Sequence, residues 1–111
     1  MIEGDVVLVQ LPQANGLLKN RPALVLREMP PFGDLLVCGI STQLRQAVPA
    51  LDFILDTGDP DFAASGLKSA SVIRLGFLVV LPTSAFIGRI GSLPAIRREQ
   101  LLDRLCKHLR A

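Results

Sequence analysis

The sequence contains one histidine and no tryptophan or tyrosine, and these absences exclude several kinds of chemistry. His108 lies near the C-terminus, where we expect a solvated residue at a helix end, and a lone terminal histidine does not support a Ser–His–Asp triad. No cluster of His, Cys, Asp and Glu has the spacing of metal ligands, so we expect neither a metal nor a cofactor. The lack of tryptophan and tyrosine disfavours base stacking, and the phenylalanines in predicted strands are expected in the core.

Cysteine is scarce, and long apolar runs are missing. Cys38 and Cys106 are far apart and belong to no recognisable motif, so we expect two small buried side chains and neither a disulfide nor a zinc site. No apolar run approaches the roughly 20 residues of a membrane span, and the first residues lack the basic region of a signal peptide. The expected location is the cytoplasm, without a membrane partner.

Apolar residues are abundant for a chain of 111 residues, which is the length of a single domain spanning residues 1–111. Half of the sequence is hydrophobic, and the surplus apolar surface predicts a two-fold homodimer. The net charge is only +2, but acidic residues gather in residues 52–61 and basic residues in 97–110. Acids pooled in one segment are expected to leave a basic face elsewhere on the molecule.

Short strands separated by turns are predicted along most of the chain. The expected strands are residues 5–11, 22–27, 35–41, 52–55, 71–75 and 77–81, with 85–90 as a strand or a turn. Between them we expect a loop at 13–20, a hairpin loop at 29–34 and a long surface loop at 56–66. Gly76, between two strand segments, is expected to mark a bulge.

One helix is predicted at the C-terminal end. Leu101, Leu102, Leu105 and Leu109 fall on one face of a helix of about three turns, with Ser92 as its cap and Pro94 in its first turn. Because no crossover helices separate the strands, the pattern predicts a mainly β fold, a small and highly curved β-barrel with a C-terminal α-helix.

The remaining candidates for chemistry are arginines and hydroxyls at the ends of predicted strands. Arg21 enters a strand just before Pro22, Ser41 ends another strand, and Arg74 interrupts an apolar strand. Each has a structural explanation as well: a surface charge, a turn signal, and a residue on a polar strand face. The pattern alone leaves these alternatives open.

Several segments, in this order and at this spacing, are similar to a known family over nearly the whole chain. They are Gly4–Val7, Arg21–Leu26, Ile40–Gln43, Gly66–Lys68 with Ser71–Leu75, and the terminal leucine-spaced helix. Together they resemble the MazF/PemK family of toxins. The resemblance implies a compact SH3-like, PemK-like barrel, a homodimer, and metal-independent, sequence-specific cleavage of single-stranded RNA. It also implies an antitoxin whose disordered tail occupies the RNA groove, with operator DNA as a partner of that complex.

The resemblance also implies roles for individual residues. The catalytic arginine of the family falls on Arg21, its catalytic threonine on Ser41, and the arginine of PemK-type members on Arg74. The residues expected to hold the RNA backbone or bases are Lys19, Thr42, Gln43 and Lys68. The acid that PemK-type members place two residues after the second arginine falls on Gly76, and the polar stretch that follows it in the family is apolar here, at residues 77–81.

Arginines and hydroxyl-bearing residues suffice for RNA cleavage, because the 2′-hydroxyl of RNA is itself the nucleophile and the enzyme need not supply one. Guanidinium groups bind phosphate oxygens in a bidentate manner and stabilise negative charge in the transition state. The expected products are a 2′,3′-cyclic phosphate and a 5′-hydroxyl. Arginine remains protonated, so the groups that move protons are not assigned.

Two other functions remain open. A toxin that poisons DNA gyrase shares this barrel fold, and a fold alone does not determine function. A degenerate member of the family would bind RNA or a protein partner without cutting RNA. Gly76 and the apolar residues 77–81 favour that second alternative.

Overall fold

A curled antiparallel sheet with a helix on its outside forms the fold of this computed structural model, which describes residues 1–12 and 14–111. The strands are β1 (Asp5–Pro12), β2 (Leu18–Met29), β3 (Asp34–Ser41), β4 (Phe53–Leu55), β5 (Ser71–Leu81) and β6 (Phe86–Ser92). The helices are α1 (Phe62–Ser65) and α2 (Ala95–Leu109), and two 3-10 turns are η1 (Leu44–Gln46) and η2 (Thr83–Ala85). The predicted mainly β fold with a C-terminal helix is confirmed.

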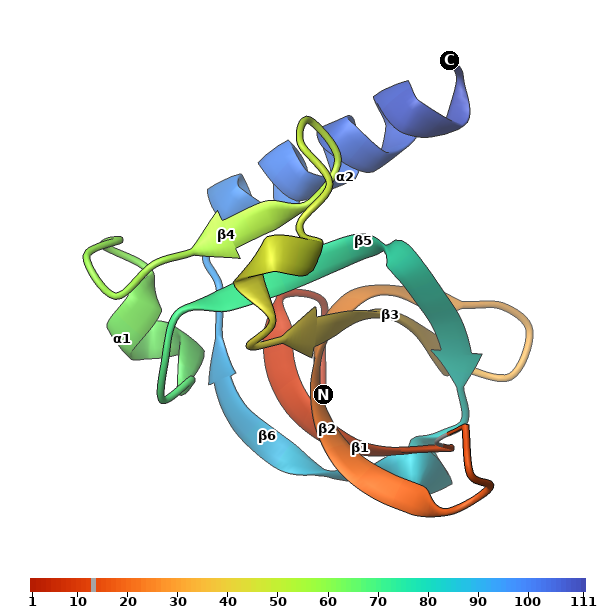
Figure 1. The fold of residues 1–111 in the computed structure, drawn as a ribbon. Helices are drawn as coiled ribbons and strands as arrows, with labels where there is room; N and C mark the ends of the chain where they lie inside the picture. Colours follow the sequence, from red (N-terminus) through yellow and green to blue (C-terminus); the bar gives the residue numbers. More distant parts are fainter. Residues whose placement is uncertain (13) are drawn as a thin grey trace.

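The strand order across the six-stranded sheet is β4-β5-β3-β2-β1-β6, and each neighbouring pair is antiparallel. Figure 1 shows β1, β2, β3, β5 and β6 curling round, with β4 and α2 outside the curl. Within the described part of the chain, the edge strands β4 and β6 do not pair with each other. The sheet is therefore open and only loosely barrel-like, whereas a compact barrel was expected.

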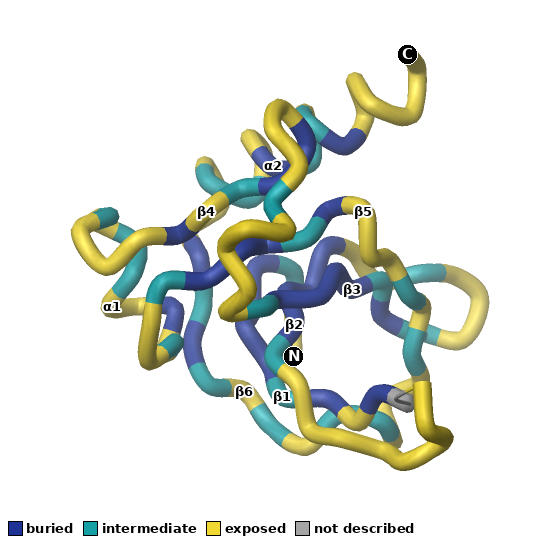
Figure 2. The backbone as a smooth tube through the Cα atoms, in the orientation of Figure 1, coloured by how far each residue is buried: buried dark blue, intermediate teal, exposed yellow. Residues whose placement is uncertain are grey.

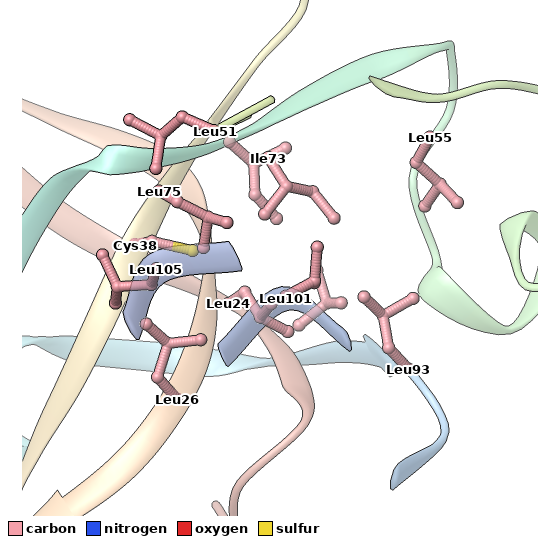
Figure 3. Packing of buried hydrophobic residues seen from close by; sticks show 12 residues of the cluster. Leu24, Leu26, Cys38, Leu51, Leu55, Ile73, Leu75, Leu93, Leu101 and Leu105 are labelled. Atoms are coloured by element: carbon pink, nitrogen blue, oxygen red, sulfur yellow. The ribbon is translucent and has the colours of Figure 1, made fainter. Parts of the chain in front are cut away.

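The two faces of the sheet bury separate sets of apolar residues, because successive side chains along a strand point to opposite faces. One face carries the cluster Val7, Val9, Leu11, Ala23, Val25, Leu35 and Val37. The other face packs against α2 in a larger cluster that includes Leu24, Leu26, Cys38, Ile73, Leu75, Leu101 and Leu105 (Figure 3). Residues one position apart in a strand thus belong to different clusters. A slip of one residue would move every side chain to the wrong face, so the register of each strand is fixed.

The terminal helix begins at Ala95 and is 15 residues long, so it has about four turns. Leu101 and Leu105 are buried as predicted, but Leu109 is 68% exposed because the end of the helix extends beyond the sheet (Figure 2). The predicted cap was also wrong, since Ser92 is the last residue of β6 and Pro94 occupies the cap position.

Several other boundaries differ from the sequence predictions. The segments predicted at 71–75 and 77–81 form the single strand β5, and β2 starts at Leu18, inside the predicted loop 13–20. The part of that loop at residue 13 lies outside the described residues. The predicted loop 56–66 contains the one-turn helix α1, and the ambiguous segment 85–90 is mostly β6.

Gly76 lies in a bulge of β5, as predicted. Cys38 of β3 is opposite Leu78, but the next residue, Gly39, is opposite Arg74. Residues 75–77 therefore have no counterpart on β3. A bulge of this kind bends the strand and redirects the side chains within it.

The Gly4–Asp5 segment fixes the start of β1. Gly4 has a φ of +91°, its N–H donates to the Val25 carbonyl at 2.8 Å, and its own carbonyl accepts the Leu93 N–H at 2.8 Å. Asp5 accepts a hydrogen bond of 3.0 Å from Nε of Arg89 on β6. This part of the family likeness therefore corresponds to residues that hold the fold together.

The acidic segment and the basic helix neutralise each other. Arg97 donates from Nη2 to Asp59 at 3.0 Å and from Nε to Asp61 at 2.9 Å. Its guanidinium also lies over the Phe53 ring, 4.5 Å from the centroid, and Arg104 donates to the Asp52 carbonyl at 2.6 Å. Arg97 and Arg104 of α2 therefore hold residues 52–61 against the fold and do not form a free basic face.

The two free cysteines differ in environment. Cys38 is fully buried, as expected, and desolvation raises the pKa of its thiol to about 12. Cys106 is exposed on α2, so its predicted burial was wrong. None of the helices in the described segments has both the length and the apolar character needed to cross a membrane.

Candidate functional site

A pocket of about 380 Å³ lies where β2 and β3 approach the bulge of β5. Its lining consists of Leu11, Ala14, Arg21, Pro22, Gly39, Ile40, Ser41, Thr42, Gln43, Gln46, Arg74 and Phe77. Five of the seven predicted site residues are in this list. Lys19 and Lys68, both exposed, are not in it: Lys19 lies on β2 opposite Leu11, and Lys68 lies between α1 and β5.

The strand register explains why three distant residues share the pocket. Ala23 is opposite Gly39, and Gly39 is in turn opposite Arg74. Arg21 precedes Ala23 by two residues, and Ser41 follows Gly39 by two. Because side chains alternate between the two faces of a sheet, Arg21 and Ser41 are on the same face as Ala23 and Gly39. The two guanidinium groups and the hydroxyl therefore approach one hollow from three adjacent strands.

Ser41 combines its predicted structural role with a place in the pocket. Its Oγ accepts the N–H of Gln43 at 3.1 Å, which is a serine turn. This bond uses an acceptor position of the hydroxyl, and the hydroxyl hydrogen can still be donated to a ligand. The same turn directs Thr42 and Gln43 toward the pocket and leads into η1, which contributes Gln46.

Phe77 is the main lining residue that sequence reasoning missed. It was expected in the core, but it is 41% exposed, and its ring lies 5.8 Å from Cζ of Arg74. The only signal in the sequence was Gly76, which marked the bulge without showing that the bulge spans residues 75–77. Leu75, at the start of the bulge, is fully buried.

Asp52 connects the two irregular segments that surround the pocket. Its Oδ1 accepts the buried Leu75 N–H at 3.0 Å, and its Oδ2 accepts the Val48 N–H at 2.9 Å. The carboxylate, 8% exposed, thus joins the loop after η1 to the bulge of β5. Nothing in the sequence pattern distinguished Asp52 from the other acids of its segment.

The charge of the lining is entirely positive. Arg21 and Arg74 are its only charged residues, and the described lining contains no carboxylate, histidine, lysine or cysteine. Among the described residues, no group of three or more His, Cys, Asp and Glu could hold a metal ion. A hollow with two guanidiniums, hydroxyls and amides is suited to bind a phosphodiester through charge-assisted hydrogen bonds.

The sequence and the fold both match known toxins. The family model described as "PemK-like, MazF-like toxin of type II toxin-antitoxin system" matches residues 2–109. Among solved structures, the chain is similar to the Mycobacterium tuberculosis toxin MazF-mt6, with a TM-score of 0.71, 23% identity and 96% of each chain covered. No curated protein sequence matches. The chain therefore belongs to the PemK/MazF-like toxin family of type II toxin–antitoxin systems.

Proposed function

We propose that this toxin is a metal-independent endoribonuclease that cuts single-stranded messenger RNA in the pocket between the first half of β2, the end of β3 and the bulge of β5. The observation that carries the proposal is the convergence of Arg21, Ser41 and Arg74 on this hollow from three strands. Members of the family generally have endoribonuclease activity. The positive lining suits a polyanionic substrate.

The proposed reaction is an internal transfer at phosphorus. The 2′-oxygen of one nucleotide forms a bond to the adjacent phosphorus, and the bond from phosphorus to the 5′-oxygen of the next nucleotide breaks. The proton lost by the 2′-hydroxyl is balanced by the proton that the departing 5′-oxygen gains. Arg21, with Ser41 as a second donor, stabilises the charge that builds on the phosphate oxygens. Arg74 supplies a further phosphate contact or donor, and the described lining contains no carboxylate or histidine.

The other lining residues would position the strand. Thr42 and Gln43 have hydroxyl and amide groups that bind phosphates or base edges, and only base contacts specify a sequence. Lys19 and Lys68 are outside the lining and would at most contact RNA that extends beyond it.

The partners proposed for this toxin follow from its family and its surface. Exposed apolar side chains such as Leu18, Val80 and Ile87 are consistent with a homodimer. A cognate antitoxin would neutralise the toxin in the cytoplasm, and operator DNA would be bound through the antitoxin complex.

Binding without cleavage is the second candidate function. It is favoured by the absence of a carboxylate or histidine from the described lining. By the family resemblance, Gly76 of β5 also stands at the position of the acid of PemK-type members. A pocket lined in this way can bind phosphate, but its described lining supplies no carboxylate or imidazole as a general acid or base.

The direct test is incubation of the purified protein with a long unstructured RNA in excess EDTA. We expect fragments that carry a 2′,3′-cyclic phosphate on one side of the cut and a 5′-hydroxyl on the other, at the rate seen without EDTA. Terminal phosphate analysis by mass spectrometry distinguishes these ends from those of a contaminating hydrolase.

Two results would contradict the nuclease proposal. Intact RNA in a stable complex with the protein would establish the binding function in its place. Cleavage that stops in EDTA and returns with added Mg²⁺ would show that a metal, and not the arginine pair, carries the chemistry.

A further inference from the structure

Phe77 is a large apolar side chain exposed at the edge of a polar, positively charged pocket. It is 41% exposed, and the lining to which it belongs also includes Arg74, Ser41 and Gln43. Burial of a phenylalanine ring stabilises a fold, so an aromatic ring held partly in water at such a site calls for an explanation.

The local fold holds the ring in this place. Residues 75–77 form the bulge, in which Leu75 is fully buried while Phe77 is exposed beside the pocket. Gly39, on the facing strand, leaves space for the ring, because a Cβ at that position would lie 3.0 Å from Cδ1 of Phe77. Arg74 lies on the other flank, with Cζ 5.8 Å from the ring centroid.

We infer that Phe77 is a stacking platform for one base of single-stranded RNA, beside the phosphate bound by the arginines. The inference rests on the proposed function, because it needs RNA in the pocket. Unpaired bases expose a π face that stacks on aromatic side chains, and proteins that bind single strands combine such platforms with positive charge. Here the platform and the charge are three residues apart on β5, at Phe77 and Arg74.

A nucleic acid fits this arrangement better than an apolar protein segment does. Half of the described lining residues are polar or charged, and the charges among them are the guanidiniums of Arg21 and Arg74. An apolar peptide would take the Arg74 guanidinium out of water without supplying an anion, which is costly. A single strand of RNA supplies a phosphate for each cation and a base for the ring.

The test uses a short 2′-O-methyl RNA, randomised in sequence except for a central 2-aminopurine. This probe lacks the nucleophilic hydroxyl, so binding is measured without cleavage. Phe77→Leu is expected to weaken binding on the order of tenfold to a hundredfold, which is the range for the loss of one stacked base. Phe77→Tyr should restore the affinity. Phe32→Leu is the matched control, because Phe32 is 86% exposed and lies outside the pocket lining.

Two further readouts separate stacking from a structural effect. The wild type and Phe77→Tyr should quench 2-aminopurine fluorescence, whereas Phe77→Leu should not at saturating protein. The slope of log Kd against log salt should be the same in Phe77→Leu as in the wild type, whereas Arg74→Ala should reduce it by about 0.7 for one phosphate contact.

Each outcome decides the matter. Equal binding by the wild type and Phe77→Leu overturns the stacking platform, leaves the nuclease proposal intact and points to a protein partner for this ring. A salt slope that falls in Phe77→Leu assigns the residue a structural role in placing Arg74. If the wild type binds no RNA at all, the proposed function itself fails.

Discussion

Replacement of Arg21 with alanine is expected to lower kcat/KM for RNA cleavage by on the order of 10²- to 10³-fold, the usual loss when one preorganised donor to a developing oxyanion is removed. Arg21 is on the pocket-lining part of β2, on the same face as Ser41 and Arg74. Its planar guanidinium can donate two hydrogen bonds to the phosphate as negative charge builds there. Cleavage of a fluorescently labelled RNA at saturating and limiting concentrations measures both kinetic constants.

The chain offers a matched control on the same strand. Arg27 is 68% exposed, lies 3.8 Å from the Glu3 carboxylate, and does not line the pocket. Arg27→Ala should keep full activity. Arg21→Lys should be intermediate, because lysine keeps the charge and loses the bidentate geometry. Full activity of Arg21→Ala would remove Arg21 from the mechanism.

Asp52→Ala is expected to lower the free energy of unfolding by about 2–4 kcal/mol, because it leaves the N–H groups of Leu75 and Val48 without their acceptors. The Leu75 N–H is buried, so water cannot easily replace the lost carboxylate. The same substitution removes the link between the loop after η1 and the bulge of β5 that contains Phe77. We therefore expect weaker RNA binding as well as a lower midpoint in urea.

Two variants make this prediction specific. Asp52→Asn keeps one carbonyl acceptor and places an amide donor against the second N–H, so its stability should fall between those of the wild type and Asp52→Ala. Asp56→Ala is the control, since Asp56 is exposed and its carboxylate accepts only the N–H of the adjacent Thr57 in the described structure. Equal stability of Asp52→Ala and Asp56→Ala in urea denaturation would show that the link between loop and bulge is unimportant.

The pattern of strand residues predicted much of the fold because apolar strand segments alternate with turn-forming residues. The same pattern marked two candidate residues: Arg21, which enters a predicted strand, and Ser41, which ends another. Which strand ends meet depends on the register between β2, β3 and β5, and one residue of slip would change the faces. The family likeness, and not the periodicity, brought these residues together before the structure was known.

Lys19 and Lys68 lie outside the lining, and their contacts with RNA stay predictions. The differences between prediction and structure have identifiable physical causes. Phe77 was assigned to the core because a single glycine does not reveal how many residues a bulge contains. The pairing of Arg97 with Asp59 and Asp61 joins residues 36 and 38 positions apart, which no local pattern can indicate.

The most direct test of the central claim is a double-mutant cycle on cleavage between Arg21→Ala and Ser41→Ala. If both side chains act on one phosphodiester, the second substitution should cost far less in a protein that already lacks the first, because residues that act as a unit are not additive. The account predicts a double variant only slightly slower than Arg21→Ala. Losses that multiply in full would contradict it, since they would show that the guanidinium and the hydroxyl act independently.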